Sequence, residues 1–383
     1  MNYIPYGTQC IEEDDITAVV ETLKSGYLTT GPKVLEFEDE LKKVTGSKYA
    51  VAVANGTAAL HIATMNLNLK PDDEVITTPI TFAASANCVL YCGGKPVFVD
   101  IDEDTMLIDI DIIKKAITKK TRAIIPVDYG GEICNMDELS KLADFHGLEI
   151  IHDCAHSLGS KINGKYAGEY QGQQIWSFHP VKTITTGEGG AITTNDEEMY
   201  KSLLRFRTHG ITRDKTQYSY PYKNSEELEY STWYYEMLDL GYNYRLTDFQ
   251  CALGVSQLKK LDRFAKRRHE IVEQYNTAFE GLPIKVQKSP QWSDPVRHLY
   301  TIRVNDKSKR DGVFKTLTDK NIGVNLHYIP VYLMPYYKKI GYKSGICPIA
   351  EDAYDKMITI PLHQSMTDNE VEYVIECVIE AVK

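Results

Sequence analysis

The sequence predicts an α/β fold in which a large domain with a mostly parallel mixed sheet between helices precedes a smaller C-terminal α/β domain. Two patterns support this prediction. Short apolar runs alternate with amphipathic stretches from about residue 23 to residue 195. After residue 195 this alternation ends, and a long helical stretch follows. Hydrophobic residues make up 43% of the 383 residues and charged residues 25%, which excludes a disordered or coiled-coil chain.

The first half of the chain contains seven strand candidates, most of them bounded by Gly, Pro, Asp or Asn. They are Ala50–Ala54, Glu74–Thr78, Pro96–Val99, Ala123–Val127, Glu149–His152, Gln174–Phe178 and Gly190–Thr194. The helix candidates between them are Thr57–Leu67, Thr81–Cys92, Ile110–Ile117 and Met136–His146. Strands that alternate with helices favour a parallel sheet covered on both faces.

The pattern changes after residue 195. A helix is expected over Met199–Arg207, then an aromatic, acidic segment at 218–235, then one long helix from Thr247 to about Glu280. We expect strands near Leu299–Val304 and Val324–His327 and helices near Asp311–Lys320 and Asp368–Val382. The predicted division is an N-terminal segment 1–20, a large domain 21–250 and a small domain 251–383.

Charge and composition exclude several classes of protein. There are 43 Lys and Arg residues against 53 Asp and Glu, a formal net charge of −10, which argues against a nucleic-acid-binding protein or one attracted to anionic membranes. No apolar run reaches the roughly 18 residues of a membrane span, and the N-terminus lacks the pattern of a signal peptide. We interpret the 8 scattered cysteines as reduced thiols of a cytoplasmic protein.

Lys182 lies in the most informative segment, Trp176–Gly190, where it follows a predicted strand and precedes a run of Thr and Gly. Ligands in α/β folds bind near strand ends, and a desolvated lysine there can attack a carbonyl group. Taken alone, the residue fits a solvated loop lysine better.

Asp153 strengthens the functional interpretation, because it ends the apolar strand Ile150-Ile151-His152 and needs a partner there. A protonated pyridine nitrogen would be such a partner, with His156 beside the phenolate oxygen of the same ring. The competing interpretation is a metal site, because His152, Asp153, Cys154 and His156 are all ligand types. Strand alternation points neighbouring side chains to opposite faces and no further ligand pair is present, so we predict no metal.

Two further segments suit a flat phosphorylated ligand. Asn55-Gly56-Thr57 is a small-residue turn that opens a helix, where free backbone N–H groups favour a phosphate. Phe82 follows another strand and could stack on a ring, although either feature alone is also common for steric reasons or for core packing.

Together these segments resemble the DegT/DnrJ/EryC1/StrS sugar aminotransferases, which are fold-type I pyridoxal-phosphate enzymes. The resemblance runs from Tyr6 to the C-terminus. Its motifs occur in the family order: Gly26-Tyr27-Leu28-Thr29-Thr30-Gly31, Asn55-Gly56-Thr57-Ala58-Ala59-Leu60, Asp153-Cys154-Ala155-His156-Ser157, Ser177-Phe178-His179-Pro180-Val181-Lys182 and Gly241-Tyr242-Asn243-Tyr244-Arg245-Leu246.

The resemblance implies a role for each matching residue. Lys182 would hold pyridoxal 5′-phosphate as an internal aldimine and then move a proton between the amino donor and the cofactor. Asp153 would pair with the ring nitrogen, His156 would contact the phenolate, and Phe82 would stack on the ring. The expected phosphate contacts are Gly56, Thr57, Ser177 and, from the neighbouring subunit, Asn243, which implies a homodimer. The residues expected to border the substrate are Tyr6, Thr29, His327 and Tyr328.

Within the family, several stretches resemble the 4-aminotransferase of pseudaminic acid biosynthesis, among them Thr77–Asn87, Val127–Gly131 and His209–Thr212. That resemblance implies conversion of UDP-2-acetamido-2,6-dideoxy-β-L-arabino-hexos-4-ulose to UDP-4-amino-4,6-dideoxy-N-acetyl-β-L-altrosamine, with L-glutamate as amino donor. The alternatives are another nucleotide keto sugar, of different 4-keto stereochemistry or a dTDP-3-keto sugar, and a non-catalytic sensor or scaffold that binds the same cofactor. The segment 218–235 could cover the nucleotide sugar or be a packed surface loop.

Overall fold

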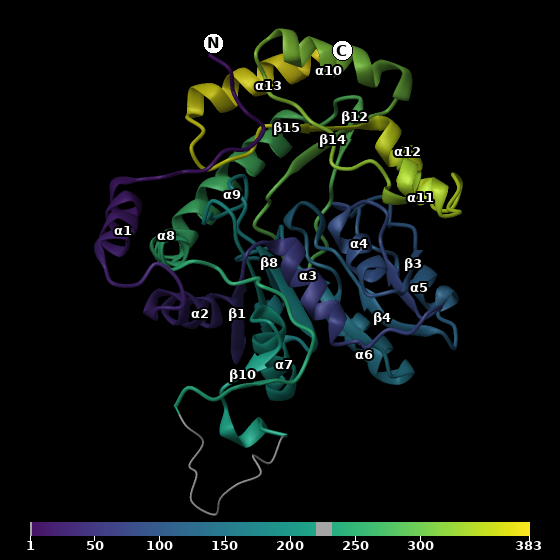
Figure 1. Cartoon of the computed structure of the whole chain (residues 1–383). Helices are drawn as coiled ribbons and strands as arrows, with labels where there is room; N and C mark the ends of the chain where they lie inside the picture. The colour runs from purple at the N-terminus through teal and green to yellow at the C-terminus, as the bar shows by residue number, and fades with distance from the viewer. Residues whose placement is uncertain (1, 220–231) are drawn as a thin grey trace, which may run out of the picture.

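The centre of the molecule is a seven-stranded sheet (Figure 1). The computed structural model describes residues 2–219 and 232–383. The strand order is β1-β9-β8-β5-β4-β2-β3, and every pairing is parallel except those of β9, which runs antiparallel to both its neighbours. The strands are β1 (Tyr49–Val53), β2 (Glu74–Thr77), β3 (Lys95–Phe98), β4 (Thr121–Ile125), β5 (Glu149–Asp153), β8 (Gln173–Ser177) and β9 (Gly190–Thr194). All seven predicted strands are confirmed within about two residues.

Helices cover both faces of this sheet because its strands bury both sets of alternating side chains. In β1, Val51 and Val53 pack into the core beneath one set of helices, whereas Ala50 and Ala52 pack into the core on the other face. The first set comprises α3 (Gly56–Met65), α4 (Ala84–Tyr91) and α7 (Glu197–Arg207). The second comprises α2 (Pro32–Thr45), α5 (Ile110–Ala116), α6 (Met136–His146) and α8 (Asp248–Leu258).

A smaller antiparallel sheet carries the C-terminal part of the chain. Its order is β12 (Ile284–Val286), β14 (Tyr300–Val304), β15 (Met357–Ile360), and it shares a core with α9 (Leu261–Ala278), α10 (Arg310–Asp319) and α13 (Asp368–Val382). Ile4 belongs to the same core and pairs with Ile322, so both ends of the chain lie on this side of the molecule (Figure 1).

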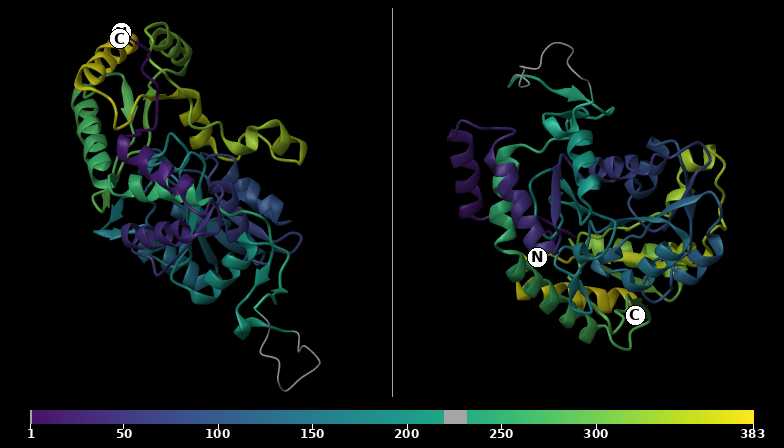
Figure 2. Two further views of the ribbon diagram at one scale, coloured as in Figure 1. Left: turned by 60° about the vertical axis from the view of Figure 1, so that its left-hand side comes forward. Right: turned by 90° about the horizontal axis from the view of Figure 1, so that it is seen from below.

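Two short helices of the C-terminal part, α11 (Pro335–Lys339) and α12 (Pro348–Lys356), pack instead against the large sheet. Figure 2 shows this yellow-green segment reaching away from the small sheet. Asp100 fixes it, because its carboxylate accepts the backbone N–H groups of Ile349 and Ala350 at 2.9 Å. The predicted boundary after residue 250 falls inside α8, and the division into domains stays a prediction.

Two expectations for the second half were wrong. The single helix expected from Thr247 to Glu280 is two helices, α8 and α9. The helix is interrupted because the N–H of Lys260 bonds the carbonyl of Gln257, only three residues back. The ammonium group of Lys260 lies 2.7 Å from Asp15 of α1 (Glu13–Lys24). Val324–His327 is not a strand: Asn325 pairs with Thr359 in an isolated bridge, after which the chain turns into the cavity described below.

The remaining elements are short. β6 (Lys161–Ile162) and β7 (Lys165–Tyr166) form a hairpin that pairs with β13 (Ser293–Asp294), and β10 (Ile211–Thr212) pairs with β11 (Glu236–Met237). Most of the aromatic segment 218–235, residues 220–231, lies outside the described residues. Within the described part, no helix is both long and apolar enough to cross a membrane.

Candidate active site

A cavity of about 720 Å³ lies at the carboxyl ends of the parallel strands, where α/β folds place ligands. Its walls come from the turns after β1, β2, β5 and β8 and from residues 325–329 of the C-terminal part. Ten of the residues predicted for the site line it: Tyr6, Gly56, Thr57, Phe82, Asp153, His156, Ser177, Lys182, His327 and Tyr328. Segments more than 300 residues apart in sequence therefore meet here.

Two predicted site residues do not line this cavity. Asn243 is exposed and pairs with Thr208, and Thr29 is exposed and pairs with Thr247. The structure thus gives neither residue a contact with the site of its own chain. The expectation that Asn243 serves a neighbouring subunit stays a prediction, as does a substrate contact for Thr29.

Lys182 reaches the cavity from the loop between β8 and β9. A turn closed by a 2.9 Å bond from the Lys182 N–H to the carbonyl of His179 positions it, and the partly buried side chain faces the cavity. Burial lowers the pKa of Lys182 to about 8, and the negative charge of Asp153 opposes this shift. Its amine is therefore available as a nucleophile or base much nearer neutrality than that of a solvated lysine.

Asp153 ends β5 and is 5% exposed. Its carboxylate accepts a hydrogen bond of 2.7 Å from the Ser85 hydroxyl and one of 3.1 Å from the Ala155 N–H. Burial raises the pKa of Asp153 in spite of these bonds. A cationic group placed against this carboxylate would offset the cost of its desolvation.

His156 lies three residues beyond Asp153 and is also buried. Its Nδ1 lies 3.3 Å from the N–H of Gly130, and its Nε2 lies 3.2 Å from the Tyr328 hydroxyl. Because a backbone N–H can only donate, Nδ1 accepts and the proton of the neutral ring sits on Nε2. Burial lowers the pKa of His156 well below its usual value, so the ring is an uncharged N–H donor.

The start of α3 forms a small-residue cradle. Asn55 caps the helix by accepting the Ala58 N–H at 2.8 Å, and among the described residues the N–H groups of Gly56 and Thr57 have no partner, so they are available to a ligand. A Cβ atom added to Gly56 would lie 3.1 Å from the Cβ of Ser177, so glycine permits the close approach of the Ser177 loop. This arrangement suits a phosphate group.

The mouth of the cavity is aromatic. Phe82 is 62% exposed, and its ring centroid lies 6.3 Å from that of Tyr328. The rings of Tyr6 and His327, which also line the cavity, are 5.1 Å apart, and Nδ1 of His327 lies 3.0 Å from the Thr359 hydroxyl. An exposed aromatic ring beside a cavity is available to stack on a planar ligand.

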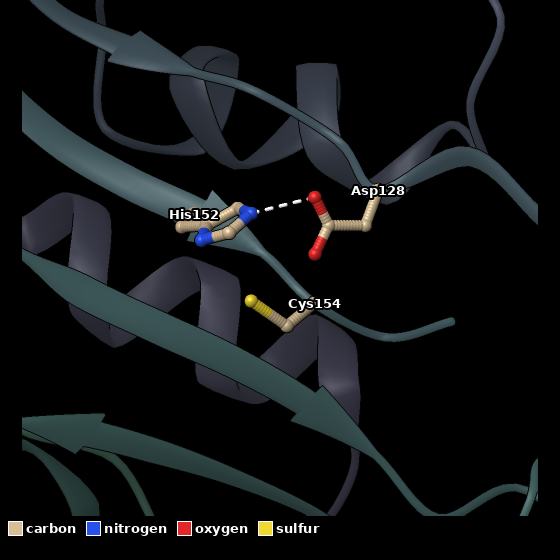
Figure 3. A group of neighbouring side chains, drawn as sticks. All are labelled: Asp128, His152 and Cys154. Carbon is tan, nitrogen blue, oxygen red and sulfur yellow. Dashed lines mark hydrogen bonds and ion pairs between the residues drawn. The ribbon is translucent and has the colours of Figure 1, made fainter. Parts of the chain in front are cut away.

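The potential metal ligands among residues 152–156 lie on opposite sides of β5, as strand alternation predicts. His152 and Cys154 lie behind β5 with Asp128, with one ligand atom of each within 4.8 Å of the others (Figure 3). Asp153 and His156 line the cavity instead. Asp128 is already bonded to Nε2 of His152 at 2.6 Å and to the Ser157 hydroxyl at 2.5 Å. Burial raises the pKa of the Cys154 thiol well above its usual value, so it is not a ready thiolate ligand.

Sequence reasoning missed several buried residues of the cavity wall, among them Ser85 and His298. Ser85 lies inside the stretch Thr77–Asn87 that carried the resemblance, but nothing in its spacing linked it to Asp153. His298 precedes β14 without any motif around it. Only the fold brings these side chains to the site.

The residues of the cavity fit pyridoxal phosphate. This cofactor combines a phosphate, a flat ring, a basic ring nitrogen and an aldehyde, and the cavity offers in turn a helix N-terminus, an exposed Phe82, a buried carboxylate and a lysine of lowered pKa. The desolvated Asp153 is the strongest sign of fit, because a cation beside it would offset the cost of burying its charge.

Comparisons with known proteins agree with this chemistry. Residues 9–379 match the model of the DegT/DnrJ/EryC1/StrS aminotransferase family. The spore coat polysaccharide biosynthesis protein SpsC of Bacillus subtilis is 39% identical over 391 residues, covering 100% of this chain and 98% of that protein.

Solved structures with the same fold include two of particular interest. Spr1654 of Streptococcus pneumoniae in its PMP form has a TM-score of 0.91 and 34% identity over 99% of both chains. Helicobacter pylori PseC, an aminotransferase involved in pseudaminic acid biosynthesis, has a TM-score of 0.90 and 32% identity over 100% of this chain and 99% of its own. The chain therefore belongs to the DegT/DnrJ/EryC1/StrS family and is a pyridoxal-phosphate-dependent nucleotide-sugar aminotransferase.

Proposed function

We propose that the enzyme transfers the amino group of L-glutamate to C4 of UDP-2-acetamido-2,6-dideoxy-β-L-arabino-hexos-4-ulose, giving UDP-4-amino-4,6-dideoxy-N-acetyl-β-L-altrosamine. The observation that carries this proposal is the whole-length likeness to PseC, together with the stretches Thr77–Asn87 and Val127–Gly131. Both stretches lie beside the cavity, the first around Phe82 and the second around Gly130.

The cofactor supplies an electron sink when it is bound. Lys182 would hold the cofactor through its aldehyde carbon and would move a proton at Cα of glutamate. Asp153 would keep the ring nitrogen charged, and the Nε2–H of His156 would donate to the phenolate oxygen. Gly56, Thr57 and Ser177 would hold the phosphate, and Phe82 would stack on the ring. An amine with a pKa near 8 serves as both acid and base in this sequence.

Tyr6, His327 and Tyr328 enclose the cavity on the side of the small sheet, and we assign them to the sugar nucleotide. We also propose a homodimer whose sites are shared through Asn243, and a substrate contact for Thr29. The homodimer is supported by apolar side chains that are exposed in the single chain and that a second subunit would bury. They are Ile16, Val20 and Leu23 on α1, with Tyr27 and Leu28 just beyond it.

The test is product identification. Purified enzyme, L-glutamate and the UDP-4-keto sugar should yield the 4-amino sugar nucleotide, whose C4 configuration is read by NMR, with 2-oxoglutarate formed in equal amount. Lys182→Ala should abolish turnover and the visible absorbance of the bound cofactor. Turnover by Lys182→Ala would contradict the role given to this residue.

A second candidate is transfer to another nucleotide keto sugar. The 39% identity to SpsC, a protein of spore coat polysaccharide biosynthesis, supports this second candidate. A panel of UDP- and dTDP-linked 4-keto and 3-keto sugars separates the two candidates. A preference for a sugar of other stereochemistry would reject the pseudaminic acid assignment and leave the amino transfer intact.

A further inference from the structure

His298 is a second imidazole in the wall of the cavity, beside His156. It is 4% exposed, and its ring centroid lies 4.6 Å from that of His156. It comes from the segment before β14, on the same side as His327 and Tyr328. The side chains facing the predicted cofactor position, such as Asp153 and Ser177, come instead from the large sheet. His298 therefore lies on the side of the cavity that is assigned above to the sugar nucleotide, next to the His156 ring.

The two ring nitrogens of His298 have different surroundings. Nδ1 is buried and has no hydrogen-bond partner among the described residues. Nε2 is not enclosed in this way, and no hydrogen bond within the described chain uses it, which leaves it facing the cavity that His298 lines. A buried N–H without a partner is rarer than a buried acceptor without one, so the proton belongs on Nε2. His298 thus directs an N–H donor into the cavity.

Arg268 holds this histidine in place from behind. It is fully buried in α9, and its Nη1 donates to the carbonyl groups of Arg297 at 3.2 Å and His298 at 3.4 Å, and to that of Leu362 at 3.1 Å. Its Nη2 donates to the side-chain oxygen of Gln364 at 2.8 Å. All four acceptors are neutral, and within the described residues no carboxylate pairs with this guanidinium.

Burial is the main reason that His298 is neutral. Burial lowers the pKa of His298 well below its usual value, and the positive charge of Lys182 and of Arg268 and the neighbouring rings of His156 and His327 act in the same direction. A neutral imidazole keeps Nε2–H as a single directed donor, suited to an oxygen acceptor such as a carboxylate, carbonyl or hydroxyl oxygen.

We propose that His298 is a substrate-binding residue whose Nε2–H donates a hydrogen bond to an oxygen of the bound amino donor or keto sugar, and that Arg268 is its positioning residue. This inference rests on the proposed amino transfer. It adds a residue that no motif indicated, and it predicts a polar contact on the side of the small sheet.

The test separates the two half-reactions of the holoenzyme. L-Glutamate alone is added to the pyridoxal-phosphate form, and the UDP-4-keto sugar alone to the pyridoxamine-phosphate form, each at concentrations below saturation and followed by cofactor absorbance. His298→Phe removes the donor and keeps a flat ring, His298→Gln restores an N–H donor, and His146→Phe is a matched control at an exposed histidine of α6.

We expect His298→Phe to slow at least one half-reaction about 10- to 100-fold, the range for one hydrogen bond to a bound ligand. His298→Gln should recover part of that loss, while thermal unfolding and cofactor affinity stay close to those of the His146→Phe control. A loss confined to glutamate identifies the donor carboxylate as the acceptor, and a loss confined to the sugar identifies a sugar oxygen.

Half-reaction rates of His298→Phe within twofold of the wild type would overturn the inference. So would equal losses in His298→Phe and His298→Gln accompanied by weaker cofactor binding, because that result is typical of a structural role. If His298→Phe does not fold, His298→Gln against His298→Ala provides the same comparison. Failure of the wild-type enzyme in both half-reactions would instead reject the proposed function itself.

Discussion

The hydroxyl group of Ser85 donates a hydrogen bond of 2.7 Å to Oδ2 of Asp153, and the Thr81 hydroxyl lies 2.7 Å from that of Ser85. Ser85 lies in α4 and Asp153 at the end of β5, so the bond joins a helix to the strand end that faces the cavity. It lowers the pKa of Asp153, whereas burial raises it. Ser85 therefore helps to keep the carboxylate ionised.

We expect Ser85→Ala to weaken cofactor binding. Without this donor the pKa of Asp153 rises further and less of the carboxylate is ionised to pair with a ring nitrogen. A hydrogen bond to a charged group is worth about 1.5–3 kcal/mol, and only the part that differs between the free and the bound enzyme changes affinity, so the dissociation constant for pyridoxal phosphate should rise by up to about 10-fold. Equilibrium titration of the apoenzyme measures it, with Ser308→Ala, an exposed serine of the small domain, as control. An unchanged constant would refute the link.

The lowered pKa of Lys182 predicts how cofactor capture depends on pH. Only the neutral amine attacks the aldehyde, so the rate of covalent capture by the apoenzyme should rise about tenfold per pH unit below about 8 and level off above it. A solvated lysine would give a rate that keeps rising to about pH 10. Stopped-flow absorbance between pH 6 and 10 distinguishes these profiles.

Asp153→Asn provides a check on that profile. The negative charge of Asp153 raises the pKa of Lys182, so removing it should move the plateau to lower pH. The slope below the plateau should not change, because it reports a single amine. A plateau that moves to higher pH would contradict the electrostatic coupling of the two groups.

The cavity was predictable from sequence where its residues follow strands. The turns after β1, β5 and β8 carry Gly56, Asp153 and Lys182, and parallel strand ends meet at one edge of a sheet. Ser85 and His298 reach the site only through packing across the fold, and no local spacing records such contacts. The side chain of Asp128, behind β5, was missed for the same reason.

Helix α1 shows a different limit. In this helix Asp15 and Thr22 are buried, whereas the apolar residues Ile16, Val20 and Leu23 are exposed. The pattern of apolar residues therefore predicts the wrong buried face of α1 for the single chain. Neither α1 nor α2 was predicted. The proposed homodimer would account for this pattern, because the exposed apolar residues would then face the neighbouring subunit.

Arg297 and Glu132 form a buried ion pair whose removal should test the segment that carries His298. Nη2 of Arg297 lies 2.7 Å from Oε2 of Glu132, and both side chains are almost fully buried. Arg297→Met leaves the carboxylate without its cation and should lower the free energy of unfolding by about 3–5 kcal/mol. The double variant Arg297→Met, Glu132→Gln should recover part of this loss, which chemical denaturation measures. A double variant no more stable than the single one would show that the charge pairing is not the cause.

Shared active sites predict that two inactive variants restore activity when they are mixed. Lys182→Ala lacks the amine, and Asn243→Ala lacks a residue that is exposed and away from the cavity of its own chain. In a mixed dimer, Lys182 of one subunit meets Asn243 of the other, so one of the two sites is complete. Random exchange of subunits makes half of the dimers mixed, and activity should reach about a quarter of the wild-type value.

The assay is steady-state turnover after unfolding and refolding the variants together. The control is a mixture of Lys182→Ala with the double variant Lys182→Ala, Asn243→Ala, which should stay inactive. If Asn243 acted within its own subunit, the mixture of the two single variants would recover no activity, because no site would hold both residues.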